Sequence, residues 1–341
     1  MKEVSNTIYI QSILQSIDIN PQRMVSLNGK PYGTEFTNPY TQQPSNKMLF
    51  QTLEGLIYNT YYCRNTVRFD NLIKTPSYQE IEMHLNKLSL SNISVELFDA
   101  GWTIEHIDMQ GQITAKKSNL KRYVFPGEFV NDSMFHQKPA VDATIRLIAR
   151  KDHKDPSAGF YYVFGNTLGE DNMSQLVRIY FNSMPEGAPV LINNITGSLN
   201  ELMIPFNFKC LNHPFYYTRC DTAVLYFDKR YVNLIFEVLS TFYKEIKPFL
   251  NADCPAFTKI IAPGISFAEN PLKQDESFGT HCSKMIVQGI MNAYNKNLPK
   301  QNWFAEVKIA VEQQHKYKNI DILYLNPETK FPYNFPNFSA Q

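Results

Sequence analysis

Apolar residues recur at helical spacing in the first third of the chain. Three runs place them on one face of a helix: Ile10, Ile13, Leu14 and Ile17; Leu49, Leu53, Leu56 and Ile57; and Ile81, Leu85 and Leu88. Residues 102–125, around Gln110-Gly111, have instead the pattern of a hairpin. We therefore predict a mainly helical N-terminal region over residues 1–125, whose role the pattern does not indicate.

The second half has a different rhythm, in which short strand-like runs alternate with longer helical ones. We predict strands at 176–182, 206–211, 222–228 and 256–261, and helices at 185–203, 230–250 and 281–296. The order β-α-β-β-α-β is typical of a split βαβ, ferredoxin-like core. We expect an α+β protein in which residues 126–341 form a second domain, with a mixed or antiparallel sheet and helices on one face. Within it, residues 126–157 have the turn formers of a linker or of surface loops.

Strand alternation decides which side chains share a face. In residues 176–182, Arg178, Tyr180 and Asn182 point to one side, and the apolar residues between them point to the other. A polar strand face is ordinarily a solvated one, and the pattern alone leaves both interpretations open. The segment 205–227 is less ordinary, because Lys209 and Arg219 interrupt an apolar, aromatic run.

Composition excludes several classes of protein. The net charge of the 341 residues is +1, so bulk charge favours neither nucleic acid nor a membrane surface as a partner. The N-terminus does not resemble a signal peptide, and no apolar run approaches the about 18 residues of a membrane span. Five cysteines without disulfide-type spacing indicate a reducing compartment, so we expect a cytoplasmic protein.

Motifs of the common enzymes are missing. The sequence has no GxGxxG, no GxxxxGK[ST], no GxSxG and no HExxH. Cys210, His213 and Cys220 have some zinc-ligand character, but a structural zinc site needs a fourth partner in regular pairs. We therefore expect neither a metal nor an organic cofactor.

Cations spread over several predicted strands are the remaining signal. Arginine holds phosphate through two parallel bonds, and helix N-termini add backbone donors. A lysine close to other cations loses part of the stabilisation of its ammonium form and can act as a general base. Together these groups suit abstraction of an α-proton followed by expulsion of phosphate. The candidates are Arg178, Lys209, Arg219, Lys259 and His281.

Several segments between about residues 155 and 300 resemble the HopA-type effector family, which includes the lyase component of class V lanthipeptide synthetases. They are "GFYYVFGNTLGE", "PFNFKCL", the Y-x-R-x-D-x-A-V-L-Y run that begins at Tyr217, "FTKIIAPGISFAENP" and "ESFGTHCSK". No single one is specific, but together they are. The resemblance implies an enzyme that eliminates phosphate from phosphoserine or phosphothreonine and leaves dehydroalanine or dehydrobutyrine. It makes residues 126–341 the catalytic domain.

A more distant likeness to the phosphothreonine lyase effectors implies individual roles. The order Arg178-x-Tyr180, Lys209, Arg219, Tyr226 is similar to theirs, which makes Lys209 the base and Arg219 a phosphate ligand. Arg178 and Lys259 are further phosphate ligands under this interpretation. Tyr180 stands where those lyases have their acid histidine. The general acid therefore stays open among three residues, Tyr180, His213 and His281.

Each candidate also has a plain structural interpretation. Lys209 could extend along apolar surface, Arg219 could pair with Asp221, and His213 could be a turn residue. Likewise Arg178 and Lys259 could be solvated strand residues, and His281 could only start a helix. We expect a phosphorylated precursor peptide as substrate, and a kinase and a cyclase as partners. The alternatives are a non-catalytic phosphopeptide-binding protein and a virulence effector lyase acting on host phosphoproteins.

Overall fold

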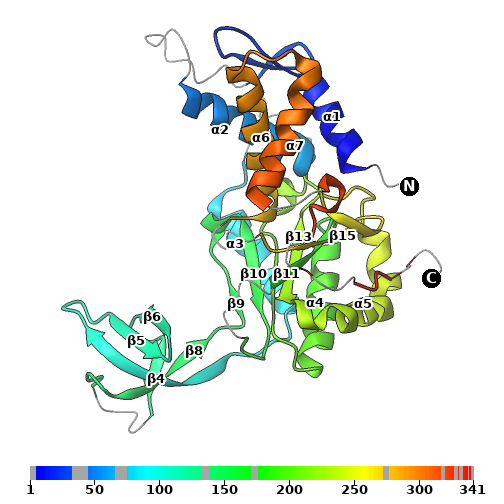
Figure 1. The fold of residues 1–341 in the computed structure, drawn as a ribbon. Helices are drawn as coiled ribbons and strands as arrows, with labels where there is room; N and C mark the ends of the chain where they lie inside the picture. The colour runs from blue at the N-terminus through cyan, green and yellow to red at the C-terminus, as the bar shows by residue number, and fades with distance from the viewer. Residues whose placement is uncertain are drawn as a thin grey trace.

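A computed structural model describes residues 5–32, 45–65, 75–132, 138–169, 176–271, 276–315, 319–325, 329, 333–336 and 338. The described chain has three parts (Figure 1). A central sheet carries helices along one side, a helical group that joins the N-terminus to α6 and α7 lies above it, and a smaller sheet projects away as an arm. The α+β fold class is thereby confirmed.

The central sheet has seven antiparallel strands in the order β14-β15-β11-β13-β12-β10-β9. Their bounds are β9 (Asp152–His153), β10 (Phe160–Phe164), β11 (Leu176–Phe181), β12 (Phe206–Leu211), β13 (Ala223–Asp228), β14 (Lys259–Ala262) and β15 (Ile265–Glu269). With α4 (Gly187–Glu201) and α5 (Val232–Ile246), the strands β11, β12, β13 and β15 form the predicted split βαβ core. Its fourth strand is β15, whereas the strand predicted at 256–261 corresponds to the edge strand β14.

The two faces of the central sheet are covered by different helices. Alternate residues such as Ile179, Phe208 and Leu225 join a core with α4, α5 and α3 (Tyr78–Ser91). The other set, which includes Tyr180 and Val224, joins a second core with the helical group. That group contains α1 (Asn6–Ser16), α2 (Asn46–Leu56), a π-helical turn η2 (Ile57–Tyr62), α6 (Phe278–Asn295) and α7 (Trp303–His315), with short strands β1 (Ile17–Ile19), β2 (Val25–Leu27) and β3 (Lys30–Tyr32).

The N-terminal helices form where the apolar spacing predicts them. Ile10, Leu53 and Leu85 are buried on α1, α2 and α3 respectively. Serine caps begin each helix: Ser5, Ser45 and Ser77 accept a hydrogen bond from the backbone of the first turn, and Ser77 with Glu80 completes a capping box.

The arm is a five-stranded antiparallel sheet in the order β6-β5-β4-β8-β7. It comprises β4 (Leu97–Ile107), β5 (Ile113–Lys117), β6 (Leu120–Val124), β7 (Phe129–Asn131) and β8 (Thr144–Ala149), and encloses a small core around Trp102. The predicted hairpin at 102–125 lies in it. The predicted boundary after residue 125 falls inside this sheet, between β6 and β7. The segment 126–157, predicted as a linker or loops, contributes β7, β8 and β9.

Candidate functional site on the central sheet

Lys209 lies on the sheet face that does not meet α4 and α5. On β12 it stands directly opposite Tyr162 of β10 and Val224 of β13, while its neighbours Phe208 and Cys210 enter the core on the other side. The Lys209 Nζ lies 4.3 Å from the centre of the Phe160 ring. Aromatic faces attract a cation at such distances. The half-buried amine of Lys209 is therefore held among aromatic rings, next to the buried Val224.

Tyr226 joins Lys209 to Arg178. Arg178 stands directly opposite Tyr226 in the β11–β13 ladder, and its guanidinium carbon lies 5.4 Å from the centre of the Tyr226 ring. The Lys209 Nζ lies 5.6 Å from the same ring centre. Arg178 is buried, and its Nη2 donates to Oδ1 of Asn270. Two cations from different strands thus contact one half-buried tyrosine.

Tyr180 shares this face with Arg178, as strand alternation predicts. Its ring is buried and meets the ring of Tyr62 edge-on, at 6.5 Å between centres. Burial raises the pKa of Tyr180 to about 12, and the nearby Arg178 guanidinium opposes part of that rise. The hydroxyl is therefore protonated at neutral pH. It lies in a closed environment under the helical group.

Half-buried Arg219 forms an ion pair with the buried carboxylate of Asp221. Its Nη2 lies 2.7 Å from Oδ2 of Asp221, and its Nε donates to the second oxygen of the same carboxylate. Nη2 of Arg219 also lies 3.1 Å from the Tyr58 hydroxyl and 2.9 Å from the Cys63 sulfur. This bidentate geometry occupies the Nε–Nη2 edge of the guanidinium, so a phosphate could bind along that edge only in place of the Asp221 carboxylate.

The two candidate histidines lie in separate places. The Nδ1 of His213 accepts a hydrogen bond of 3.2 Å from the backbone of Phe215 and so starts a short 3-10 turn. Its ring lies 5.8 Å from that of His84 on α3. His281 is buried in the first turn of α6, with Nδ1 3.1 Å from Oε2 of Glu276.

Lys259 lies on the opposite side of the sheet from Lys209. It pairs with Phe267, whose ring enters the core with α4 and α5, and its Nζ lies 5.9 Å from the Phe335 ring centre. The structure therefore brings Lys209, Arg178 and Tyr180 to one face but leaves Lys259 and His213 elsewhere. A series of tyrosine contacts connects this face to Arg219: Tyr180 meets Tyr62, Tyr62 stacks on Tyr58 at 5.3 Å between ring centres, and Arg219 contacts the Tyr58 hydroxyl.

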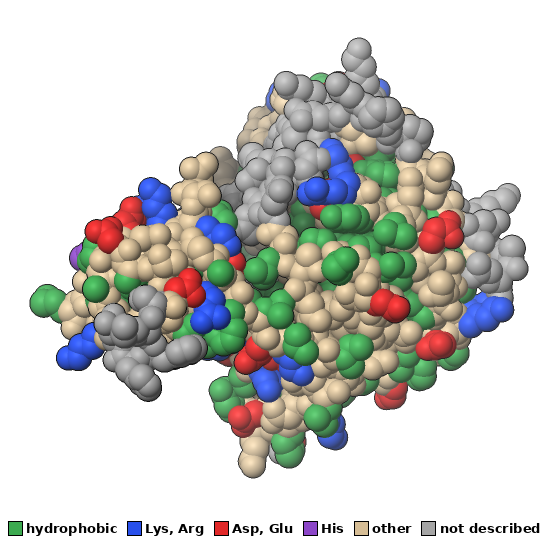
Figure 2. Space-filling model, turned by 90° about the horizontal axis from the view of Figure 1, so that it is seen from below, with side chains coloured by type: hydrophobic (Ala, Val, Ile, Leu, Met, Phe, Trp, Pro, Cys, Tyr) green, Lys and Arg blue, Asp and Glu red, His purple; other side chains and the backbone are tan. Residues whose placement is uncertain are grey.

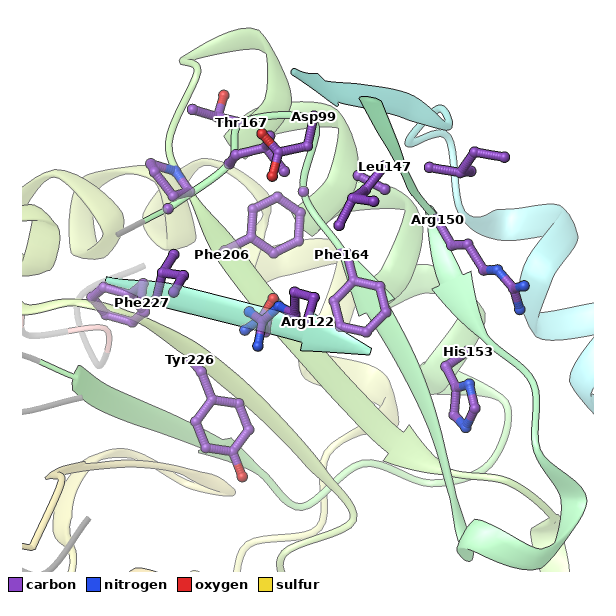
Figure 3. A pocket seen from close by; sticks show the side chains of 18 of the residues that line it. Asp99, Arg122, Leu147, Arg150, His153, Phe164, Thr167, Phe206, Tyr226 and Phe227 are labelled. Carbon is purple, nitrogen blue, oxygen red and sulfur yellow. The ribbon is translucent and has the colours of Figure 1, made fainter. Parts of the chain in front are cut away.

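A cleft of about 700 Å³ opens between the arm and the central sheet. Tyr226 of β13 and Asn207 of β12 line it on the sheet side. Asn207 is two residues from Lys209 along β12. Figure 3 shows Tyr226 and Phe164 from the sheet together with Arg122, Arg150 and His153 around this cleft. Two arginines that line the cleft form ion pairs with carboxylates. Arg150 Nη2 lies 3.1 Å from Glu128 Oε1, and Arg230 Nη2 lies 3.0 Å from Asp228 Oδ2.

Sequence reasoning did not select Tyr226 as a site residue, although alternation along 222–228 places it on the face of Lys209. Within the described ranges, no group of three or more His, Cys, Asp and Glu side chains is placed to hold a metal ion. Cys210 lies in the core that the sheet forms with α4 and α5, and the Cys220 thiol donates to the carbonyl of Tyr62. The side chains considered above as zinc ligands therefore do not point to one site. In the part of the chain that the structure describes, no helix is both long and apolar enough to cross a membrane.

The model of the HopA1 effector protein family matches residues 152–325. The chain belongs to this family. The predicted resemblance is thus confirmed, and the match covers the central sheet from β9 onward but not the arm.

Two solved effector proteins of Pseudomonas syringae are similar in structure. That of pv. tomato strain DC3000 has 13% identity and a TM-score of 0.45, over 84% of this chain and 92% of that one. That of pv. syringae strain 61 has 12% identity and a TM-score of 0.45, over 94% and 97%. No curated protein matches the chain.

Proposed function

We propose that this protein is a phosphoserine/phosphothreonine lyase acting on a phosphorylated peptide. The observation that carries the proposal is the position of Lys209 beside Tyr226, which itself lines the cleft, with Arg178 against the same ring. A base, a hydroxyl and a buried cation then lie together on one sheet face, and the tyrosine among them lines the cleft. This combination suits removal of a proton next to a carbonyl and expulsion of an anionic leaving group.

The reaction needs no co-reactant. The neutral amine of Lys209 takes the α-proton, and the electron pair of that C–H bond forms the Cα–Cβ double bond. The bond from Cβ to the phosphate oxygen breaks, and phosphate departs with its electrons. The Tyr226 hydroxyl donates a hydrogen bond to the departing phosphate. Arg178 is too buried to bind the phosphate directly, so we assign it the role of positioning the Tyr226 ring.

The product is dehydroalanine or dehydrobutyrine, as in lanthipeptide biosynthesis. An upstream kinase must supply the phosphopeptide, because the phosphate is the leaving group. A cyclase that adds cysteine thiols to the new double bond would consume the product. An effector lyase acting on host phosphoproteins would use the same chemistry on a different substrate.

A second candidate function is binding of a phosphopeptide without chemistry. One observation favours it: the Lys209 amine lies against the faces of Phe160 and Tyr226. Aromatic faces attract the charged ammonium, whereas a general base must work as the neutral amine. A Lys209 that kept its positive charge would bind the phosphate without catalysing its elimination.

Three lysine variants separate the two functions. Lys209→Ala, Lys209→Arg and the control Lys308→Arg, an exposed residue of α7, are compared with wild type on a phosphothreonine peptide. Phosphate release, peptide mass and affinity by calorimetry are measured. We expect Lys209→Ala to lose about 10²- to 10⁴-fold in rate. Lys209→Arg keeps the charge and should bind the peptide without turnover, because arginine does not deprotonate near neutral pH.

The outcomes are distinct. A product that retains the alcohol would show hydrolysis, and the lyase proposal would fall. Normal turnover in Lys209→Arg would remove Lys209 from the role of base. Phosphopeptide binding by wild type with no phosphate release would favour the second candidate.

A further inference from the structure

The arm offers an open strand edge to the cleft. Its strands β4, β5 and β6 run as a meander, and β8 returns to pair with β4. Four residues, Phe125–Glu128, separate β6 from β7, yet β7 pairs with β8 and not with β6. Among the described residues β6 therefore pairs only with β5, and the curled sheet is open along β6.

The register identifies the backbone groups at that edge. Lys117 and Leu120 flank the two-residue turn Ser118–Asn119, in which Ser118 has φ 53°. Residues that flank such a turn exchange both hydrogen bonds, and bonded and non-bonded pairs then alternate. The N–H and C=O groups of Lys121 and Tyr123 consequently point away from β5. All residues from Leu120 to Tyr123 are exposed.

The open edge lies along the cleft that leads to Tyr226. Leu120, Arg122 and Tyr123 line one wall of it, and Phe164 and Tyr226 line the other. Figure 3 shows side chains from both walls facing the same space. The view from below shows hydrophobic and basic side chains on both sides of the junction between arm and body (Figure 2). A volume of about 700 Å³ lies within the range of ligand sites, which is ~300 to 1,000 Å³.

The chemistry of this cleft fits a polypeptide and not a polyanion. Arg150 and Arg230 at its rim are neutralised by Glu128 and Asp228, so no single-sign field runs along it. What the edge supplies is a row of alternating backbone donors and acceptors. An extended peptide satisfies such a row by adding a strand, largely independent of its own sequence.

We propose that the peptide substrate binds as an added β-strand on β6, with its phosphorylated residue at Tyr226 and Lys209. This inference rests on the proposed function for the identity of the peptide. It assigns recognition of the flanking residues to the arm and leaves the phosphorylated residue to the central sheet. Affinity for the peptide main chain is then separate from the elimination step.

The test compares one phosphothreonine peptide, flanked by alternating Val and Thr, with its unphosphorylated twin. Tyr123→Pro removes one outward N–H, and an edge strand tolerates proline. Tyr123→Ala removes the side chain but keeps the N–H and is the matched control. Binding is measured by fluorescence anisotropy, and Trp102 fluorescence of the same variants with Trp303→Phe checks that the arm is folded. We expect Tyr123→Pro to weaken the binding of both peptides at least about tenfold more than Tyr123→Ala does, because only the proline variant loses a backbone hydrogen bond.

A second measurement leaves the protein unchanged. N-methylation of successive peptide residues should weaken binding with a period of two, since alternate N–H groups of an added strand face β6. Wild-type affinity in Tyr123→Pro, a methylation effect without this period, or a wild type that binds neither peptide overturns strand addition. If β6-dependent binding is present but no phosphate is released, strand addition stands and the lyase proposal fails.

Discussion

Arg219 connects two segments that are distant in the sequence through a single guanidinium. It pairs with Asp221, which precedes β13, and contacts Tyr58 and Cys63 from the region of η2. Its position in an apolar run is therefore explained by a buried partner two residues away. The same spacing occurs on the surface, where Arg230 pairs with Asp228. The Arg219 pair is more buried and has additional contacts to Tyr58 and Cys63, so the Arg230 pair serves as an exposed reference.

We predict that Arg219→Ala lowers the free energy of unfolding by about 3 to 5 kcal/mol, because it leaves the Asp221 carboxylate buried without its partner. Arg230→Ala breaks an exposed pair and should cost less than about 1 kcal/mol. Urea denaturation followed by circular dichroism measures both. Arg219→Met with Asp221→Leu should recover most of the loss. An Arg219→Ala protein with normal stability but weakened phosphopeptide affinity would return Arg219 to the role of phosphate ligand.

The site was predictable from sequence only along continuous strands. Strand alternation correctly places Arg178 and Tyr180 on one face. The predicted strand 206–211 coincides with β12, which contains Lys209. Contacts between distant segments were not predictable, such as the one from Arg219 to Cys63, 156 residues apart in the chain. The face of Lys259 depends on the register of the β14–β15 hairpin, which side-chain patterning does not specify.

At the scale of elements, close helix packing depends on one glycine. A Cβ atom at Gly289 of α6 would lie 2.3 Å from Cα of Val307 in α7, so the two backbones meet there. Gly55 of α2 is different, because the nearest atom to its Cβ position is the side-chain nitrogen of Asn59 at 4.0 Å. Both glycines lie within α-helices, so the cost of glycine to the helix itself is similar.

We predict opposite effects of alanine at these two glycines. Gly289→Ala should lower the free energy of unfolding by about 1 to 3 kcal/mol, because a backbone cannot move aside as a side chain can. Gly55→Ala should raise it by about 0.5 to 1 kcal/mol, since alanine is the better helix former. Thermal and urea denaturation of the two variants measure this. Equal effects of both substitutions would contradict the close contact between α6 and α7.

The elements themselves were largely predictable, and the misses have physical causes. Long amphipathic helices such as α3 and α5 have strong periodic signals. Strand β15, ISFAE, is buried on both faces and therefore lacks alternation. The turn before it needs Gly264, whose φ is 76° and whose Cβ would lie 2.2 Å from the carbonyl oxygen of Asn251. In β6 four of the five residues are exposed, so its pattern does not differ from that of a loop.

At the scale of the whole molecule, the arm has a core of its own. Trp102, Ile104 and Ile145 belong to a small cluster inside it, apart from the two clusters that cover the central sheet. The protein contains two tryptophans, and the other one, Trp303, is buried in the core of the helical group. Each tryptophan therefore reports on a different core. If a peptide binds at the edge of the arm, the arm must be folded at the temperatures and denaturant concentrations at which binding occurs.

We predict that the arm unfolds before the rest of the molecule, because a small core stabilises a unit less than a large one. Trp303→Phe leaves only Trp102, and Trp102→Phe leaves only Trp303, so each variant has a single reporter. In urea, the fluorescence midpoint of the Trp303→Phe variant should lie below that of the Trp102→Phe variant. Circular dichroism of the wild type should show both transitions, and peptide affinity should be lost with the first. Coincident fluorescence curves in the two variants, both matching the circular dichroism, would show instead that arm and body unfold as one cooperative unit.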